Sequence, residues 1–234
     1  MADGDRPPRR NEARRNVSDS GVGSTEPPES GAAGFAGGGR SGKARLEDAG
    51  SGLTPATPGW FVVNVADAAW IVNDAFGARC IFESNPRVLQ DRPDLEPQHF
   101  DELGVTLAVL PPGKSGGLYH SESAQEDFLV LAGECLLLVE GEERPLRQWD
   151  FLHCPPGVNH IFVGQGDEPC VLLMVGARPE GRTLHYPRDE TALRHDAGAE
   201  EATDSPHEAY APRPHWRPGR PDTWETLPWV PSNG

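Results

Sequence analysis

The sequence predicts an all-β protein, an antiparallel sandwich or barrel, and three observations carry that prediction. Residues 60–176 hold nearly all of the long apolar runs in the 234-residue chain. These runs are short and follow one another at near-even spacing with turn residues between them, which is typical of antiparallel sheets. The length, with an apolar content of 36%, favours one domain with extensions over two full domains.

The N-terminal region, residues 1–58, is expected to be disordered. It is rich in glycine, serine, proline, alanine and charge, contains almost no large apolar residues, and shows no periodicity. Such a segment cannot bury enough surface to offset the entropy that ordering would cost. We therefore place the start of the folded domain at Gly59.

The folded domain is expected to span residues 59–177 and to consist of strands joined by turns. Glycine and proline interrupt its apolar runs and mark the expected strand ends. The expected strands lie within residues 59–72, 103–110, 118–134, 134–146 (two strands around Gly141), 150–164 (two strands around Pro155-Pro156-Gly157) and 170–177.

Residues 178–234 form a Pro-rich C-terminal extension. The stretch TALRHDAG, residues 191–198, is expected to form a short helix. The remainder carries Trp216, Trp224 and Trp229, and three tryptophans in an exposed tail would be costly to keep soluble. We expect parts of this extension to dock on the domain, the alternative being a mobile tail with scattered aromatic residues.

Charge and cysteine content restrict the compartment and the partners. The chain has a net charge of -15, and residues 1–59 are neutral, so the deficit lies in the domain and the extension. An acidic domain repels phosphate backbones, and no nucleic-acid partner is expected. No apolar run could span a bilayer, and no apolar stretch follows the N-terminal arginines as in a secretory signal. With no C-x-x-C pair, the four cysteines are expected to be reduced, and the protein cytoplasmic.

Four side chains form a constellation typical of a metal site. His120, Glu122 and Glu126 have the same parity, so they share a face if the strand is continuous. Phe128 continues this face, which indicates that it points inward. His160 lies just past the Pro-Pro-Gly turn and would approach from another strand.

Imidazole and carboxylate ligands suit a divalent Mn, Fe, Zn or Ni ion. The alternative is that these residues are solvated on an exposed sheet face. The inward parity argues against that alternative, because buried carboxylates without a partner are costly and a metal ion is a natural partner for them.

The spacing of these residues resembles the first motif of the cupins, G(X)5HXH(X)3,4E(X)6G. His120, Glu122, Glu126 and Gly133 follow the motif, except that Glu122 stands where cupins have the second histidine. The leading glycine is displaced by one position, to Gly113.

The second cupin motif, G(X)5PXG(X)2H(X)3N, is matched by Pro155, Gly157 and His160. Trp149 takes the place of its leading glycine, and Gly164 replaces its final asparagine. The resemblance covers about residues 100–177, and the pair of motifs is fairly specific.

The resemblance implies a small jelly-roll barrel, often a homodimer that exchanges edge strands, here from residues 59–84. Cupins include isomerases, epimerases, dioxygenases, decarboxylases and non-catalytic storage or sugar-binding proteins, so the fold leaves the function open. One hypothesis is a metal-dependent enzyme acting on a small polar molecule in the barrel, with the ion on His120, Glu126 and His160 and with Glu122 as fourth ligand or catalytic base. The other is a non-catalytic small-molecule binding module or partner subunit.

Overall fold

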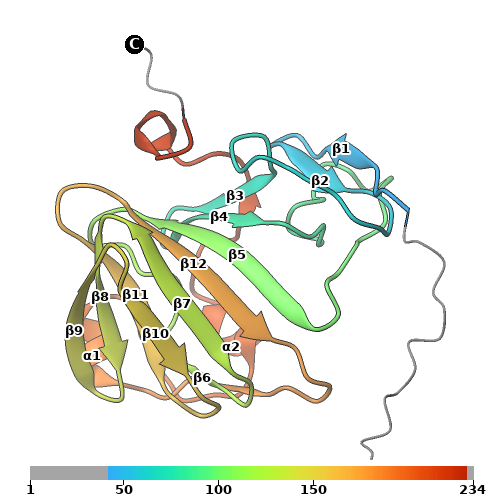
Figure 1. Cartoon of the computed structure of the whole chain (residues 1–234). Helices are drawn as coiled ribbons and strands as arrows, with labels where there is room; N and C mark the ends of the chain where they lie inside the picture. The colour runs from blue at the N-terminus through green and yellow to red at the C-terminus, as the bar shows by residue number, and fades with distance from the viewer. Residues whose placement is uncertain (1–41, 231–234) are drawn as a thin grey trace, which may run out of the picture. The chain divides into compact units, whose positions relative to one another are not determined.

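The computed structural model describes residues 42–230, which fold into antiparallel sheets with few helices (Figure 1), and the all-β prediction is confirmed. The strands are β1 (Leu46–Asp48), β2 (Leu53–Pro55), β3 (Trp70–Asn73), β4 (Gly77–Ile81), β5 (Leu103–Leu110), β6 (Ser121–Glu122), β7 (Glu126–Ala132), β8 (Glu134–Val139), β9 (Glu142–Arg147), β10 (Phe151–Cys154), β11 (His160–Gln165), β12 (Cys170–Ala177), β13 (Leu184–His185) and β14 (Arg217–Pro218). The helical segments are α1 (Glu190–Arg194), α2 (Pro206–Tyr210) and the 3-10 helix η1 (Trp224–Thr226). Within residues 42–230 no helix has both the length and the apolar character needed to cross a membrane.

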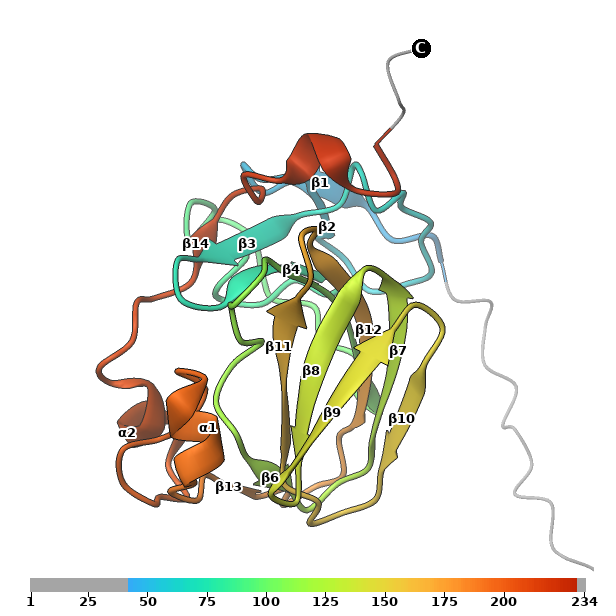
Figure 2. The ribbon, with the colours of Figure 1, turned by 90° about the vertical axis from the view of Figure 1, so that its left-hand side faces the viewer.

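Two sheets form a jelly-roll barrel. The larger has the strand order β10-β7-β12-β5-β4-β3-β14, and the smaller has the order β11-β8-β9. The small sheet faces strands β7 and β12 of the large one across the barrel (Figure 2). Buried apolar side chains from both sheets fill the space between them: Ala108, Leu110, Phe128, Val130, Cys135, Leu137, Cys154, Phe162, Cys170 and Leu172.

Strand β5 of the large sheet is a nearly continuous apolar run in the sequence because both of its faces are buried. Ala108 and Leu110 point into the barrel, whereas Leu107 and Val109 belong to a second buried cluster on the outer face. When both faces of a strand are covered, neither its odd-numbered nor its even-numbered side chains face solvent. Its apolar residues therefore do not alternate with polar ones.

The C-terminal extension covers the outer face of the large sheet. Strand β14 pairs with β3, and Trp70 of β3 is fully buried. Trp224 lies edge-on to Trp70 with ring centroids 5.5 Å apart, and Trp229 stacks on it at 5.3 Å. These contacts bury large aromatic surfaces and hold the chain end against the barrel.

The same extension also covers the small sheet. Helix α1 begins after Asp189, whose side chain accepts a hydrogen bond from the backbone N–H of Ala192 and so caps the helix. Ala192 and Ala197 pack against Leu138 and Ile161 of the small sheet.

The disorder expected for residues 1–58 is wrong for residues 42–58, while residues 1–41 lie outside the described part. Strands β1 and β2 pair with each other, and the backbone N–H of Ala44 donates to Trp60 O at 2.9 Å. Ala44 and Ala49 are buried although they are small. Backbone pairing and close packing of small residues order this segment. Neither feature can be recognised in the sequence, because the segment has almost no large apolar side chains.

Two of the stretches that were expected to contain strands are only partly in strands. In the stretch 59–72, only Trp70 onward is in a strand. The stretch 118–134 is broken at residues 123–125, where the chain leaves β13, the partner of β6, and joins β12 and β10, the partners of β7. The hydrogen bond from Ser123 N to Thr183 O, 3.0 Å, marks the end of the first pairing.

Candidate metal centre and its cavity

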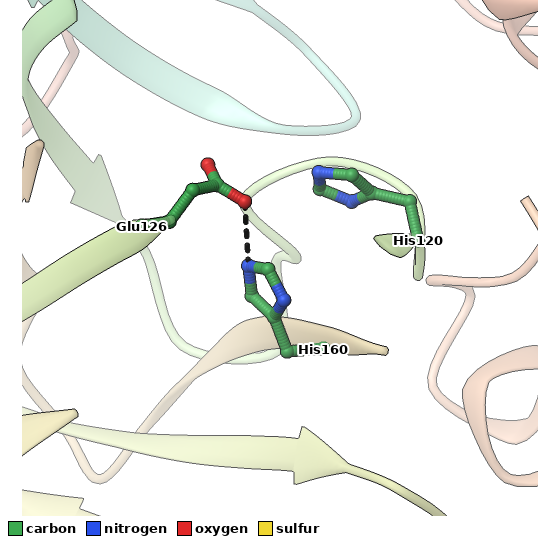
Figure 3. Close-up of side chains that lie close together, drawn as sticks. All are labelled: His120, Glu126 and His160. Carbon is green, nitrogen blue, oxygen red and sulfur yellow. Dashed lines mark ion pairs between the residues drawn. The ribbon is translucent and has the colours of Figure 1, made fainter. Parts of the chain in front are cut away.

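Three of the predicted side chains meet at one point in the structure. His120 precedes β6, Glu126 begins β7 and His160 begins β11. One ligand atom from each lies within 4.8 Å of those from the other two, and the side chains point toward one another (Figure 3). The backbones of His120 and His160 are joined by reciprocal N–H to O hydrogen bonds of 3.3 and 2.8 Å, which fixes the spacing of the two rings.

The orientation of both imidazoles is fixed by backbone carbonyls. Nδ1 of His120 lies 2.7 Å from Leu118 O, and Nδ1 of His160 lies 3.0 Å from Val158 O. A carbonyl oxygen only accepts, so each Nδ1 carries the proton and each Nε2 presents a lone pair to the cluster. This is the tautomer in which a histidine binds a metal through Nε2.

The electrostatics of the cluster also favour a cation. Burial lowers the pKa of His120 to about 3, with the neighbouring His160 adding to the effect, and burial lowers the pKa of His160 as well. Burial, reinforced by the charge of Glu122, raises the pKa of the Glu126 carboxyl to about 8. The imidazoles are therefore neutral at pH 7, and the Glu126 carboxyl without a cation is largely protonated.

The donor set fits a divalent metal ion. His160 Nε2 lies 3.4 Å from Glu126 Oε2, longer than a good hydrogen bond. Two imidazole lone pairs and one carboxylate suit Mn, Fe, Zn or Ni, and a cation bound among them would displace the proton from Glu126.

Glu122 lies beside these three side chains but is engaged elsewhere. Its Oε1 is 3.9 Å from His120 Nε2, while its Oε2 accepts a hydrogen bond from Arg182 Nη1 at 3.0 Å. Burial raises the pKa of Glu122, and Arg182 opposes this effect. The structure thus groups His120, Glu126 and His160, with Glu122 adjacent and its charge balanced by Arg182; its assignment as fourth ligand or base stays a prediction.

The three side chains line a cavity of about 850 Å³ inside the barrel. Its apolar wall includes Phe128, Phe162 and Leu172, and the C-terminal extension contributes Tyr210 and Trp216. An apolar wall with a few convergent polar groups is the usual form of a small-molecule site.

Two cavity arginines, Arg79 of β4 and Arg182 before β13, were not among the predicted site residues. Arg79 alternates with the apolar residues Ala78 and Cys80 in the sequence, which is the usual pattern of a strand with one solvated face, so its place in the cavity was not predictable. Arg182 was not predictable either, since it lies in a loop 60 positions from Glu122, its partner.

One family model and several solved structures are similar to parts of the chain. A family model described as a cupin domain matches residues 106–176. The chain is similar to the solved structure of a sugar phosphate isomerase of the cupin superfamily from Silicibacter pomeroyi, with 28% identity over 48% of this chain and 72% of that one and a TM-score of 0.36. It is also similar to a polyketide cyclase from Streptomyces resistomycificus, with 18% identity over 50% of this chain and 79% of that one and a TM-score of 0.40.

A protein from Acidithiobacillus ferrooxidans, named for a sugar phosphate isomerase activity, is similar at 25% identity and a TM-score of 0.36. That match covers 46% of this chain and 64% of the other, so it spans less than two thirds of that protein. A search of curated proteins found no match.

Proposed function

The barrel of this chain is a cupin domain, and from that premise we propose that the protein is a metal-dependent enzyme acting on a small polar molecule inside the barrel. The observation that carries the proposal is the position of the His120, Glu126 and His160 cluster on the wall of the 850 Å³ cavity. Three protein ligands leave coordination positions of a divalent ion open, as catalytic sites require.

A bound divalent ion would act as a Lewis acid on an oxygen of the substrate. The protein's own residues would prepare the site for it. Leu118 O and Val158 O hold the two imidazoles with Nε2 toward the cavity. The apolar wall, which includes Phe128, would reduce the contact of a bound substrate with water and so strengthen its interactions with the polar groups.

Glu122 is the residue we propose as the proton carrier, with a role as fourth ligand as the alternative. Its Oε1 faces His120, and its Oε2 is held by Arg182. Burial raises the pKa of Glu122 above the usual value of a glutamate, which makes its carboxylate a stronger base than a solvated one. Arg182 would thereby position the carboxylate rather than react.

One observation favours a second function, a non-catalytic small-molecule binding module or partner subunit. The carboxylate proposed as the base already forms an ion pair with Arg182 at 3.0 Å. An ion-paired carboxylate is a weaker base, and a cavity of this kind would then bind its ligand without converting it.

Elemental mass spectrometry of the purified protein tests the metal site, with an expected content of about one divalent ion per chain. The catalytic role is tested by Glu122→Gln, which should retain the ion while turnover falls by about 10²-fold or more. Arg182→Gln is the matched variant, because it breaks the same ion pair but keeps the carboxylate, and it should lose less turnover. A metal-loaded protein with no turnover on any small polar substrate would favour the binding module.

We also propose, from the family resemblance, that the protein forms a homodimer. Within the described chain β3 and β4 pair with β5 and β14 of the same chain, so an exchange of residues 59–84 would repeat these pairings between two copies. Light scattering on the purified protein should give twice the chain mass of 25.3 kDa, and a single chain mass would overturn this proposal.

A further inference from the structure

Arg79 projects a positive charge into the barrel interior. It lies in the middle of β4 and pairs with Ala108 of β5. Ala108 packs inside the barrel with Phe128 and Leu172. Directly opposed residues on neighbouring strands share a face, so the guanidinium points to the interior, where it lines the same cavity as Glu126.

Among residues 42–230 the Arg79 guanidinium has no anionic partner. Its Nη2 donates to Gly116 O, while its buried Nε has no hydrogen-bond partner in that part of the chain. It forms no ion pair with any carboxylate among residues 42–230, whereas Arg182 pairs with Glu122 at 3.0 Å and Arg178 with Glu83 at 2.6 Å. Burying a charge without a counter-charge costs free energy. A bound anion would lower that cost at Arg79, and residues 42–230 do not supply one.

The C-terminal extension holds this guanidinium in place. The centroid of the Trp216 ring lies 5.0 Å from the Arg79 guanidinium carbon, which is a cation–π contact. The Tyr210 hydroxyl accepts a hydrogen bond from Leu118 N at 3.0 Å and lines the same cavity, so its own proton can be donated to a ligand. Both residues stand at the cavity end formed by the extension, away from the apolar wall of the barrel core.

We propose that Arg79 binds the carboxylate of a small organic acid whose remainder extends toward the His120, Glu126 and His160 cluster. The proposal deepens the proposed function, on which it rests for the use of this cavity by a substrate. A planar guanidinium donates to a carboxylate through parallel N–H groups, and one unpaired guanidinium balances the single charge of a carboxylate. A phosphate ester carries more negative charge than one guanidinium balances, but Arg87 also lines this cavity, so a phosphate ester is the alternative ligand that the test distinguishes.

The test compares benzoate, benzamide and phenyl phosphate binding to the full chain by calorimetry, with its metal and again after chelation. Benzoate and benzamide have the same shape and differ in charge. Because a hydrogen bond to a charged group is stronger than one to a neutral group, benzoate should bind about tenfold more tightly than benzamide, and more tightly than phenyl phosphate. The preference should persist after chelation, since it comes from Arg79 and not from the ion.

Arg79→Gln should abolish the preference for benzoate. Arg220→Gln is the matched control: the Arg220 guanidinium also lies over a tryptophan, Trp224, at 4.3 Å and donates to a backbone carbonyl, Ala66 O, at 2.9 Å. It stands on the outer face of the large sheet and not in the cavity, so its loss should leave the benzoate preference unchanged. If Arg79→Gln does not fold, Arg79→Lys keeps the charge and should retain part of the preference.

The outcomes separate this proposal from the proposed function. Equal affinities for benzoate and benzamide in the wild-type chain would overturn the Arg79 site, even if metal analysis finds the ion. Tighter binding of phenyl phosphate would overturn the carboxylate assignment. A third outcome is a benzoate preference that depends on Arg79 in a protein that binds no metal. That outcome would support the anion site and contradict the proposal of a metal-dependent enzyme.

Discussion

The two faces of the large sheet use burial in different ways. On the outer face, Leu107 and Val109 of β5 meet Trp70, Trp224 and Trp229, and the cluster is apolar throughout. On the inner face, the apolar barrel core is followed at one end by histidines, carboxylates and arginines that line the cavity. Burial on the outer face stabilises the fold, whereas burial on the inner face shifts pKa values and leaves charges that only a ligand can balance.

The comparison predicts that changes to the outer face alter stability and leave the metal site intact. Trp70→Ala removes a fully buried ring that contacts two other tryptophans, and it should cost about 3–5 kcal/mol in the free energy of unfolding. Denaturant titration measures this loss, and elemental analysis of the folded variant should still find the ion. A loss of metal from a folded Trp70→Ala variant would mean that the two faces are coupled.

A second change concerns strands β1 and β2, beside the sheet. Residues 42–58 bury Ala44, Ala49 and Ala56, and Ala49 packs with Ile71 and Val88. A chain that begins at residue 59 should therefore be about 2–3 kcal/mol less stable than one that begins at residue 42. Thermal unfolding of the two chains provides the comparison, and equal melting temperatures would show that the two strands contribute nothing.

The sequence predicted the barrel and the three clustered side chains because both depend on short-range patterns. Two local features of the sequence were used: the equal parity of His120 and Glu126, and the turn before His160. The cupin motif spacing relates these two features to each other. The break at residues 123–125 was not predictable in this way, because it arises where the chain exchanges one partner strand for others. Glu126 nevertheless lines the same cavity as His120 and Glu122, although the continuous strand that the parity argument assumed is interrupted.

The charged partners in the cavity were missed for a related reason. Arg182 meets Glu122 across 60 positions, and Arg79 lies near Trp216 from the far end of the chain. No local pattern encodes these contacts. Strands β1 and β2 were missed because their order depends on backbone pairing with residues around Trp60 and Ala68.

Changes to the inner face should affect metal binding and leave stability nearly unchanged. His160→Ala removes one of three ligands and should weaken metal affinity by about 10-fold or more. The metal-free variant should still fold, because the barrel core is apolar. His120→Ala should behave alike.

His153→Ala is the matched control for these variants. His153 pairs with Asp127 at 2.6 Å, and its side chain is 52% exposed. Each protein would be dialysed against a weak chelator before elemental analysis. Full metal occupancy in either His120→Ala or His160→Ala, equal to that of His153→Ala, would place the ion elsewhere.

The smallest expected effect concerns a buried charge that does have its partner. Glu83 accepts hydrogen bonds from Arg178 at 2.6 and 2.7 Å and from Phe100 N at 2.8 Å. Burial alone would raise the pKa of Glu83, but Arg178 and the Phe100 N–H outweigh it and hold the pKa below its usual value. Because Arg178 is partly exposed, Glu83→Gln should cost only about 1 kcal/mol at pH 7.

The pH dependence of that loss follows from the direction of the shift. A carboxyl whose pKa is lower in the folded state contributes its full stability above the unfolded value of about 4.3, and the contribution is lost as pH falls through the folded pKa. The stability difference between the wild-type chain and Glu83→Gln should therefore be constant from pH 8 to about pH 5 and shrink in more acidic solution. Urea titrations across this range measure the difference. A stability difference that grows in acid would show that burial, and not the Arg178 ion pair, determines the pKa of Glu83. Glu83 would then not differ from Arg79, which has no ion pair among residues 42–230, as a buried charge with a partner.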